Sequence, residues 1–417
     1  MTRLPIMFAL CCLTAICSAQ VQAAKVPVPD DTVADRLRPE LLPLGVHVGA
    51  FTLFPDVGVQ AVRRNNIYSQ GQNPVDDTVT VLNPRIQLRS NWSRHSMIVA
   101  AEAEAGRFLN NSAENYDDTR LTASGRITVS RNSGFRLAGR LASLHEDRFS
   151  ADNRQGSSPT RYDQSSVSVG YQHNRARLTL EFDVALTTLD FDDVESVAGT
   201  IDNDDRDRER QSIRTRAAYE ITPDLKVYAH ATLTSLDYTT PLSAVTFARS
   251  SSGGEVAVGA TFDPTPLTTL DAFIGYAQRD YDDRRFEDLE TPVFGATLTW
   301  RVSGLTTVTA TALRGIEETA LNGAGGLVAT RIAVGVDHEL LRNLLLHASV
   351  FRRETDFAGI ERKDEDSGSR LAATYLMNRR LTVEFEYESR EREFLATATP
   401  QDGFDTGAFS LSIRSAR

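Results

Sequence analysis

Histidine is the side chain best suited to acid–base or metal chemistry near neutral pH, and this sequence spaces its histidines in a way that argues against both. They lie far apart, at His47, His95, His145, His173, His230, His338 and His347. None forms the His-Glu-x-x-His pair that places two imidazoles on one helix face. The sequence has no Gly-x-Ser-x-Gly motif, and the stretch Gly323 to Gly326 lacks the Lys-Ser/Thr that cradles phosphate. His230 near an inward carboxylate is the best catalytic candidate, but we predict no enzyme, no catalytic residue and no cofactor.

Acidic clusters are the second group that could do chemistry, because hard divalent cations prefer carboxylate oxygens. They lie at Asp76-Asp77, Asp117-Asp118, Asp192-Asp193, Asp202 to Glu209 and Asp364 to Asp366. Their spacing matches no calcium-binding loop, and arginines alternate with the acids in the longest run. We therefore expect solvated loops whose charges pair with each other and no metal site, with cations bridging to lipopolysaccharide as the alternative.

The elements that position the charged residues are strands with alternating faces. In Leu381 to Arg390, Leu381, Val383, Phe385 and Tyr387 share one face, whereas Glu384, Glu386 and Glu388 share the other. Comparable segments recur along most of the chain. This pattern is typical of a wall with lipid on one side and water on the other.

The same alternation assigns an outward and an inward face to the other strands. Outward sets include Met97, Val99, Ala101 and Ala103; Leu121, Ala123, Ile127 and Val129; Leu178, Leu180, Phe182, Val184 and Leu186; Leu225, Val227, Ala229, Ala231 and Leu233. The predicted lumen-lining residues are Arg85, Arg89, Glu102, Glu104, Arg120, Arg126, Arg136, Arg140, Glu181, Asp183, Arg214, Arg216, Lys226, His230, Glu384, Glu386 and Glu388. These charges either set a transverse field that orients polar solutes or pair across strands and stiffen the wall.

Turn signals divide the chain from residue 56 onward into strand-length segments. Eight short turns, among them His173-Asn174, alternate with nine longer polar loops, which include Thr240 to Ala248 and Ala396 to Asp402. That alternation predicts an all-β fold, a transmembrane antiparallel up-and-down β-barrel of about eighteen strands, with sixteen as the alternative. The short turns would be periplasmic and the longer loops extracellular.

The N-terminus resembles a secretory signal peptide, with Arg3, an apolar run from Ile6 to Ile16 and small residues before a cleavage site after Ala23. We predict a signal peptide over 1–23, a periplasmic lead-in over 24–55 and a barrel over 56–417. Part of the lead-in, Gly45 to Leu53, could pack against the barrel or enter its lumen. All three cysteines lie within the predicted signal, and the formal charge of −11 disfavours nucleic-acid binding.

Aromatic residues near the predicted strand ends suggest the two girdles that anchor a barrel at the membrane interfaces. Trp92, Tyr171, Tyr219 and Trp300 lie near short turns. A second girdle, near the longer loops, would consist of Phe108, Phe149, Phe191, Tyr238, Tyr281 and Phe357.

One block of the chain, Pro55 to Asp118, resembles the putative beta-barrel porin 2 family. The resemblance is carried by Asn65-Asn66-Ile67-Tyr68, by Asn83-Pro84-Arg85 and by Arg94-His95. Arg63-Arg64 departs from the acidic or small polar residues expected before the Asn pair, which weakens a role for that loop in cation contact. The resemblance implies an outer-membrane barrel, and some members are associated with exopolysaccharide biosynthesis operons.

These observations together lead us to expect a porin-like channel of the bacterial outer membrane for passive diffusion of small hydrophilic solutes. An outer-membrane component that assists exopolysaccharide export or surface attachment is the first alternative, and a surface-exposed barrel enzyme is the second. The expected partners are outer-membrane lipids and lipopolysaccharide, the barrel assembly machinery, and small polar solutes or polysaccharide.

Overall fold

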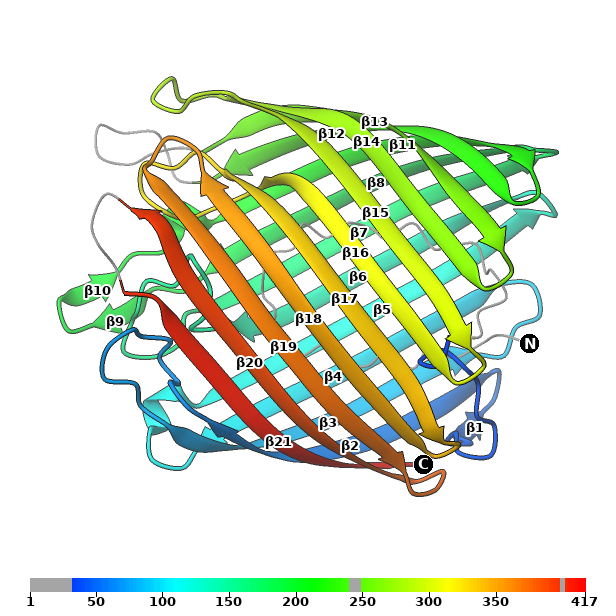
Figure 1. Ribbon diagram of the computed structural model, residues 1–417, viewed down its shortest axis with the longest axis horizontal. Coiled ribbons are helices and arrows are strands. Elements are labelled where there is room, and N and C mark those ends of the chain that lie inside the picture. Colours follow the sequence, from blue (N-terminus) through cyan, green and yellow to red (C-terminus); the bar gives the residue numbers. More distant parts are fainter. Residues whose placement is uncertain (1–31, 240–248, 398–401) are drawn as a thin grey trace.

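The computed structural model describes residues 32–239, 249–397 and 402–417, and within them the chain forms one closed antiparallel barrel (Figure 1). The ring consists of β2 (Phe51–Arg64), β3 (Asp77–Ser90), β4 (Ser96–Phe108), β5 (Tyr116–Ser130), β6 (Ser133–His145), β7 (Arg161–Arg175), β8 (Leu178–Phe191), β11 (Arg208–Thr222), β12 (Leu225–Tyr238), β13 (Ser251–Thr265), β14 (Thr268–Tyr281), β15 (Leu289–Ser303), β16 (Thr306–Glu317), β17 (Leu327–Leu341), β18 (Leu344–Phe357), β19 (Arg362–Leu376), β20 (Leu381–Thr397) and β21 (Phe404–Ala416). Each pairs with its neighbour in chain order, and β21 pairs with β2 to close the ring. Eighteen strands in the described residues confirm the predicted fold and strand number.

Strand formation follows from the alternation of side chains along each segment. On β8, Leu180, Phe182 and Val184 are 40–45% exposed on the outer surface, while Glu181 and Asp183 on the opposite face are buried. Strands of 12 to 17 residues exceed the roughly 9–11 residues that a tilted strand needs to cross the hydrocarbon layer. The predicted outward sets are therefore confirmed where their large members lie exposed, as at Leu121, Ile127 and Leu233.

Short turns gather at one end of the barrel and longer loops at the other, as the sequence predicted. One turn was placed wrongly, because β7 continues through His173 and Asn174 and the chain reverses at Ala176-Arg177. The Asn174 side chain instead accepts a hydrogen bond from Thr179 Oγ1 at 3.0 Å. Ala176 takes the left-handed conformation that turn-forming residues usually adopt, with φ of 49°.

Several shorter elements accompany the barrel strands. β1 (Val46–Val48) forms a hairpin with the start of β2, which begins at Phe51, whereas the sequence placed the start of the barrel at residue 56. The longer loops carry β9 (Val194–Ser196), β10 (Gly199–Ile201), η1 (Ser112–Glu114) and η2 (Asp204–Arg206). Among the described residues, no helix is long and apolar enough to cross a membrane.

Three of the sequence predictions concern residues outside the described part of the chain. The predicted signal peptide over 1–23 and the loop Thr240 to Ala248 lie wholly outside it, and Ala396 to Asp402 lies partly outside it. Of the lead-in, the structure describes the portion from Thr32 onward.

The girdle predicted near the longer loops is wrong for four of its members. Phe149, Phe191, Tyr281 and Phe357 are buried rather than directed to the outer surface. Three of these rings pack against guanidinium groups: Arg206 lies 4.0 Å over Phe191, Arg362 lies 4.9 Å over Phe357, and Arg390 lies 4.7 Å from Phe149. Tyr281 packs instead against the Phe286 ring. Trp92 and Trp300 near the short turns remain 44% and 46% exposed, as a girdle requires.

Candidate functional site

Loop 146–160, which joins β6 to β7, crosses the interior of the barrel. Around the ring, β8 and β11 to β15 separate β7 from β16 on one side, while β5 to β2 and then β21 to β18 separate β6 from β17 on the other. The strands that flank the loop therefore face β16, β17 and β18. Loop 146–160 contacts residues attached to that far wall, so it must span the lumen; it is called the crossing loop below.

The tip of the crossing loop docks on loop 318–326, which joins β16 to β17. Asp152 Oδ1 accepts hydrogen bonds from Thr319 Oγ1 at 2.7 Å and from the Ala320 amide at 2.8 Å, and all three groups are buried. Ala151 packs against an apolar cluster of Ala324, Leu327, Ala329 and Phe357. A buried carboxylate with two donors and an adjacent apolar contact make this a defined attachment.

A second attachment joins the crossing loop to β20. Arg390 Nη1 donates to Asp147 Oδ2 at 3.1 Å, and the Phe149 ring lies 4.7 Å from the guanidinium carbons of both Arg390 and Arg392. Burial alone would raise the pKa of Asp147, but the positive charges of Arg390 and Arg64 outweigh it and lower the pKa to about 2. The carboxylate is therefore ionised throughout the physiological range, and the contact persists.

The base of the crossing loop is fixed to neighbouring loops by two buried ion pairs. Arg206 on η2 forms a two-pronged pair with Glu146, with N–O distances of 2.8 and 3.1 Å. Arg148 pairs in the same way with Glu114 on η1, at 2.6 and 2.9 Å. Arginine and carboxylate groups matched in this geometry hold orientation as well as position.

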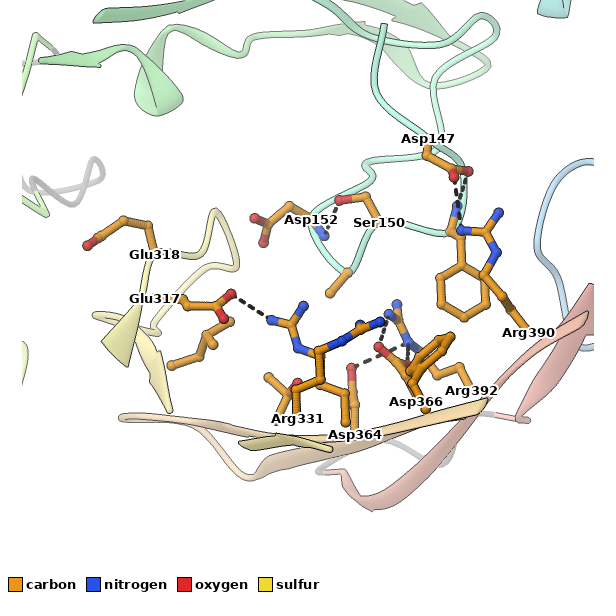
Figure 2. Close-up of a pocket in the computed structure, with 16 residues that line it drawn as sticks. Asp147, Ser150, Asp152, Glu317, Glu318, Arg331, Asp364, Asp366, Arg390 and Arg392 are labelled. Atoms are coloured by element: carbon orange, nitrogen blue, oxygen red, sulfur yellow. Dashed lines mark hydrogen bonds and ion pairs between the residues drawn. The ribbon is translucent and has the colours of Figure 1, made fainter. Parts of the chain in front are cut away.

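The far wall beneath the crossing loop is a layer of paired charges (Figure 2). Arg392 binds Asp366 through two contacts of 2.6 and 2.9 Å, and Arg353 donates to Glu317 at 2.7 Å. Figure 2 shows Asp147, Ser150 and Asp152 on the loop facing this layer. The pocket left between them has a volume of about 60 Å³, room for one or two waters at roughly 30 Å³ each.

The residues predicted to line the lumen all lie on the strand face opposite the exposed apolar side chains, and the fold brings many of them together. Arg85 and Arg120 contact Glu102 at 3.0 and 3.4 Å. Further contacts join Arg136 to Glu181 and Asp183, Arg216 to Glu181, Glu386 to Arg370, Glu388 to Arg390, Glu384 to Thr374, Glu104 to Tyr116, Arg89 to Gln87 and Lys226 to Glu220. Cross-strand pairing thus accounts for much of the inner charge.

Three predicted residues stand apart from this pairing. Arg126, Arg140 and Arg214 have no ion-pair partner within the part of the chain that the structure describes. Together with Arg89 they leave an excess of positive charge on the inner face of β3, β5, β6 and β11. Such a patch can bias which ions approach that wall.

His230, the catalytic candidate, is buried with its Nε2 2.9 Å from Glu255 Oε1 on β13, and the edge of its ring meets Phe273. A nucleophile close to this pair would be needed for hydrolysis. The carboxylate oxygens of Asp193, Asp202 and Asp204 lie within 4.8 Å of one another on an exposed loop, where the Asp202 charge raises the pKa of Asp204. Other acids of the predicted clusters pair with arginines: Asp76 with Arg63, Asp117 with Arg107 and Asp205 with Arg154.

Sequence reasoning missed the residues of the far wall, although part of the signal was present. The alternation that marks Glu384, Glu386 and Glu388 continues through Arg390 and Arg392 on the same face. Asp364 and Asp366 were predicted to lie in a loop, but they belong to β19 and pair with Arg362 and Arg392. The run of charges in Arg362 to Asp366 looked like a solvated loop because the inner face of a wide barrel accepts charge as readily as a loop does.

Comparison with known proteins gives a family match over nearly the whole chain. The family model described as Putative beta-barrel porin 2 matches residues 38–415. No curated protein matches. Among solved structures, OpdL of Pseudomonas aeruginosa is similar with a TM-score of 0.45 and 11% identity, covering 89% of this chain and 99% of that one. OccK2 (OpdF) of Pseudomonas aeruginosa has a TM-score of 0.47 and 11% identity over 87% and 98%, and the siderophore receptor PirA of Acinetobacter baumannii has 0.46 and 8% over 87% and 80%.

Proposed function

Because the chain belongs to the putative beta-barrel porin 2 family, we propose that it is an outer-membrane channel through which small hydrophilic solutes diffuse passively beside the crossing loop. The observation that carries the proposal is the docking of that loop, through Asp147 and Asp152, on the wall opposite its own strands. The loop then sets the cross-section of a lumen that would otherwise be wide. No cofactor and no chemical step are part of this function.

A location in the outer membrane is supported by the outer surface of the barrel. Leu121, Leu180, Leu233, Ile274 and Phe385 are exposed around the ring, although burial in hydrocarbon would stabilise each of them. Closure of the ring through β2 and β21 also satisfies the backbone groups that lipid cannot. The lipid of the outer membrane and its lipopolysaccharide are therefore the proposed surroundings of this surface, and the barrel assembly machinery is the proposed route to it.

A water-filled passage follows from the width of the barrel. About eight strands already enclose a space that side chains fill, and this ring has eighteen in its described part. Inner side chains such as Arg85, Glu102 and Lys226 keep 23–46% of their surface accessible. We propose that the predicted lumen residues line this passage, with Arg126, Arg140 and Arg214 favouring approach of anions to one side of it.

Recordings from single channels in planar bilayers test both the passage and the role of the crossing loop. The full chain should give discrete conductance steps. A variant with Gly-Gly in place of residues 149–154 loses both the Phe149 and the Asp152 contacts, so its steps should be larger. The matched control places Gly-Gly at Val197-Ala198, at the exposed tip of the β9–β10 hairpin, and should conduct like the parent.

Two results would count against the proposal in different ways. Absence of steps from a correctly inserted barrel would exclude an open channel. Steps of equal size in the parent and the 149–154 variant would mean that the crossing loop does not limit the passage.

A further inference from the structure

The start of the described chain lies at the end of the barrel that carries the short turns (Figure 1). Residues 32–42, called the strap below, lead through Gly45 to β1 and β2, yet they contact β16, β17 and the turns beside them. β2 and β17 are separated by β21, β20, β19 and β18 around the ring. Successive strap residues meet Gly304 and Thr307, then Glu339 and Arg342, then Arg379, so the strap follows the inner edge of this mouth from β16 to the turn before β20.

The strap docks on the inner face of the wall. The Val33 amide donates to Thr307 Oγ1 at 3.1 Å, and Val33 and Thr307 are each 1% exposed. Thr307 and Glu339 lie on the face opposite the exposed Ile332, Val334 and Leu340. Contact with inner-face residues means that the strap occupies part of the lumen at this mouth.

One carboxylate holds most of the charged contacts of the strap. Arg38 is fully buried and donates to Glu339 Oε2 at 2.8 Å, and Arg36 donates to the same oxygen at 3.0 Å. Arg342 lies 3.7 Å from the other Glu339 oxygen and also contacts Glu40 at 2.8 Å. Further exposed hydrogen bonds run from Arg379 Nε to the Glu40 carbonyl, from Arg342 Nη2 to the Leu37 carbonyl and from Arg36 Nη2 to the Gly304 carbonyl. Loss of the Glu339 charge would leave Arg38 buried without a counter-charge, which favours release of the strap.

From this arrangement we propose that the strap is a closure device: docked, it narrows the short-turn mouth, and the Arg38–Glu339 ion pair is the latch that keeps it docked. The internal hydrogen bonds of the strap are local. Thr32 Oγ1 donates to Asp35 at 2.6 Å, and the Arg36 amide donates to the Thr32 carbonyl at 2.9 Å. The strap can therefore undock as a unit while every barrel strand keeps its pairing. This inference rests on the proposed channel function.

Two measurements on the full chain test the closure. Trypsin cleavage after Arg36, detected as a new N-terminus at Leu37, reports undocking, because proteolysis follows the population of the open form. Glu339→Gln and Arg38→Met should each accelerate this cleavage, the former on the order of 100-fold. In planar bilayers, both variants should conduct more than the parent. Glu287→Gln is the control, since it removes an exposed carboxylate from the loop between β14 and β15, at the other end of the barrel from the strap.

Each outcome bears on the proposal. Faster cleavage with higher conductance in Glu339→Gln and Arg38→Met, and neither in Glu287→Gln, supports it. Faster cleavage at unchanged conductance would show a strap that undocks without obstructing the mouth, and unchanged cleavage would show that the ion pair is no latch; either result overturns the closure. Silent bilayers for all four proteins would refute the channel itself, and the closure with it, whatever trypsin reports.

Discussion

Replacing Glu146 by glutamine should release the base of the crossing loop. Arg206 is fully buried, with 0% of its surface exposed, and Glu146 is its two-pronged partner at 2.8 and 3.1 Å. Burial alone would lower the pKa of Arg206, but the Glu146 charge outweighs it and raises the pKa, so the guanidinium stays charged. Glu146→Gln keeps the side-chain shape and removes the compensating charge. Breaking a buried pair in this way costs about 3–5 kcal/mol.

The size of the effect can be read from proteolysis of the loop. At the lower end of that range, the free energy of opening the loop falls by about 3 kcal/mol. Each 1.4 kcal/mol corresponds to a factor of ten, so the population of the open loop should rise roughly 100-fold. Trypsin can cleave after Arg148 and Arg154 once the loop opens, and its rate should rise by the same factor. The stacking of Arg206 on Phe191 at 4.0 Å is kept in the variant and does not change this comparison.

Two controls make the result decisive. Glu287→Gln removes an exposed carboxylate from loop 282–288 at the same end of the barrel and should leave the cleavage rate unchanged. The double variant Glu146→Gln/Arg206→Met removes both charges, so it should be cleaved more slowly than Glu146→Gln alone. A cleavage rate for Glu146→Gln within threefold of the parent would refute the claim that this ion pair holds the loop.

Three further predictions concern pH, a turn and charge selectivity. Because the pKa of Asp147 is lowered, its ionised form stabilises docking of the crossing loop by about 2 kcal/mol above pH ~4, and this stabilisation is lost as pH falls toward about 2. Channel conductance should therefore rise over that pH window. Asp147→Asn should already conduct more at pH 7, and its conductance should change little with pH. Ala176→Gly relieves a left-handed alanine and should raise the unfolding free energy in urea by roughly 0.5–1 kcal/mol, and a decrease would contradict the assigned turn. Arg126→Glu/Arg140→Glu should shift the reversal potential in a salt gradient toward cation preference, and an unchanged potential would mean that these side chains do not face the permeating ions.

The barrel could be predicted because the alternation of side chains that marks each strand is a local feature of the sequence. In a segment such as Leu178 to Leu186, apolar residues mark the face towards lipid and polar residues mark the face towards water. Alternation and turn spacing were therefore enough to count the strands. The error at His173-Asn174 has the same origin: Asn174 is a good turn residue, but pairing of β7 with β6 and β8 keeps it in the strand. Tertiary pairing there outweighs the local signal.

The crossing loop could not be predicted because its contacts are distant in the sequence. Asp147 meets Arg390 and Asp152 meets Thr319, and no period along the chain links either pair. Phe149 and Phe357 looked like membrane-facing aromatics, since a sequence does not say on which side of a wide wall a ring lies near a strand end. The sequence left open whether Gly45 to Leu53 packs against the barrel or enters its lumen, and in the structure this segment forms β1 and the start of β2.

The pairing of β2 with β21 also constrains how the protein is made. These are the first and last strands of the ring, and Arg414 links them by pairing with Asp56 on β2 and donating to Asn83 on β3 at 3.0 Å. Until β21 has been synthesised, β2 has an unsatisfied edge that could recruit another chain. Folding must therefore wait for contacts of the highest sequence separation, which are slow to form and expose the chain to aggregation. The order in which the contacts form therefore predicts that truncation near residue 404 yields aggregates and not a smaller ring.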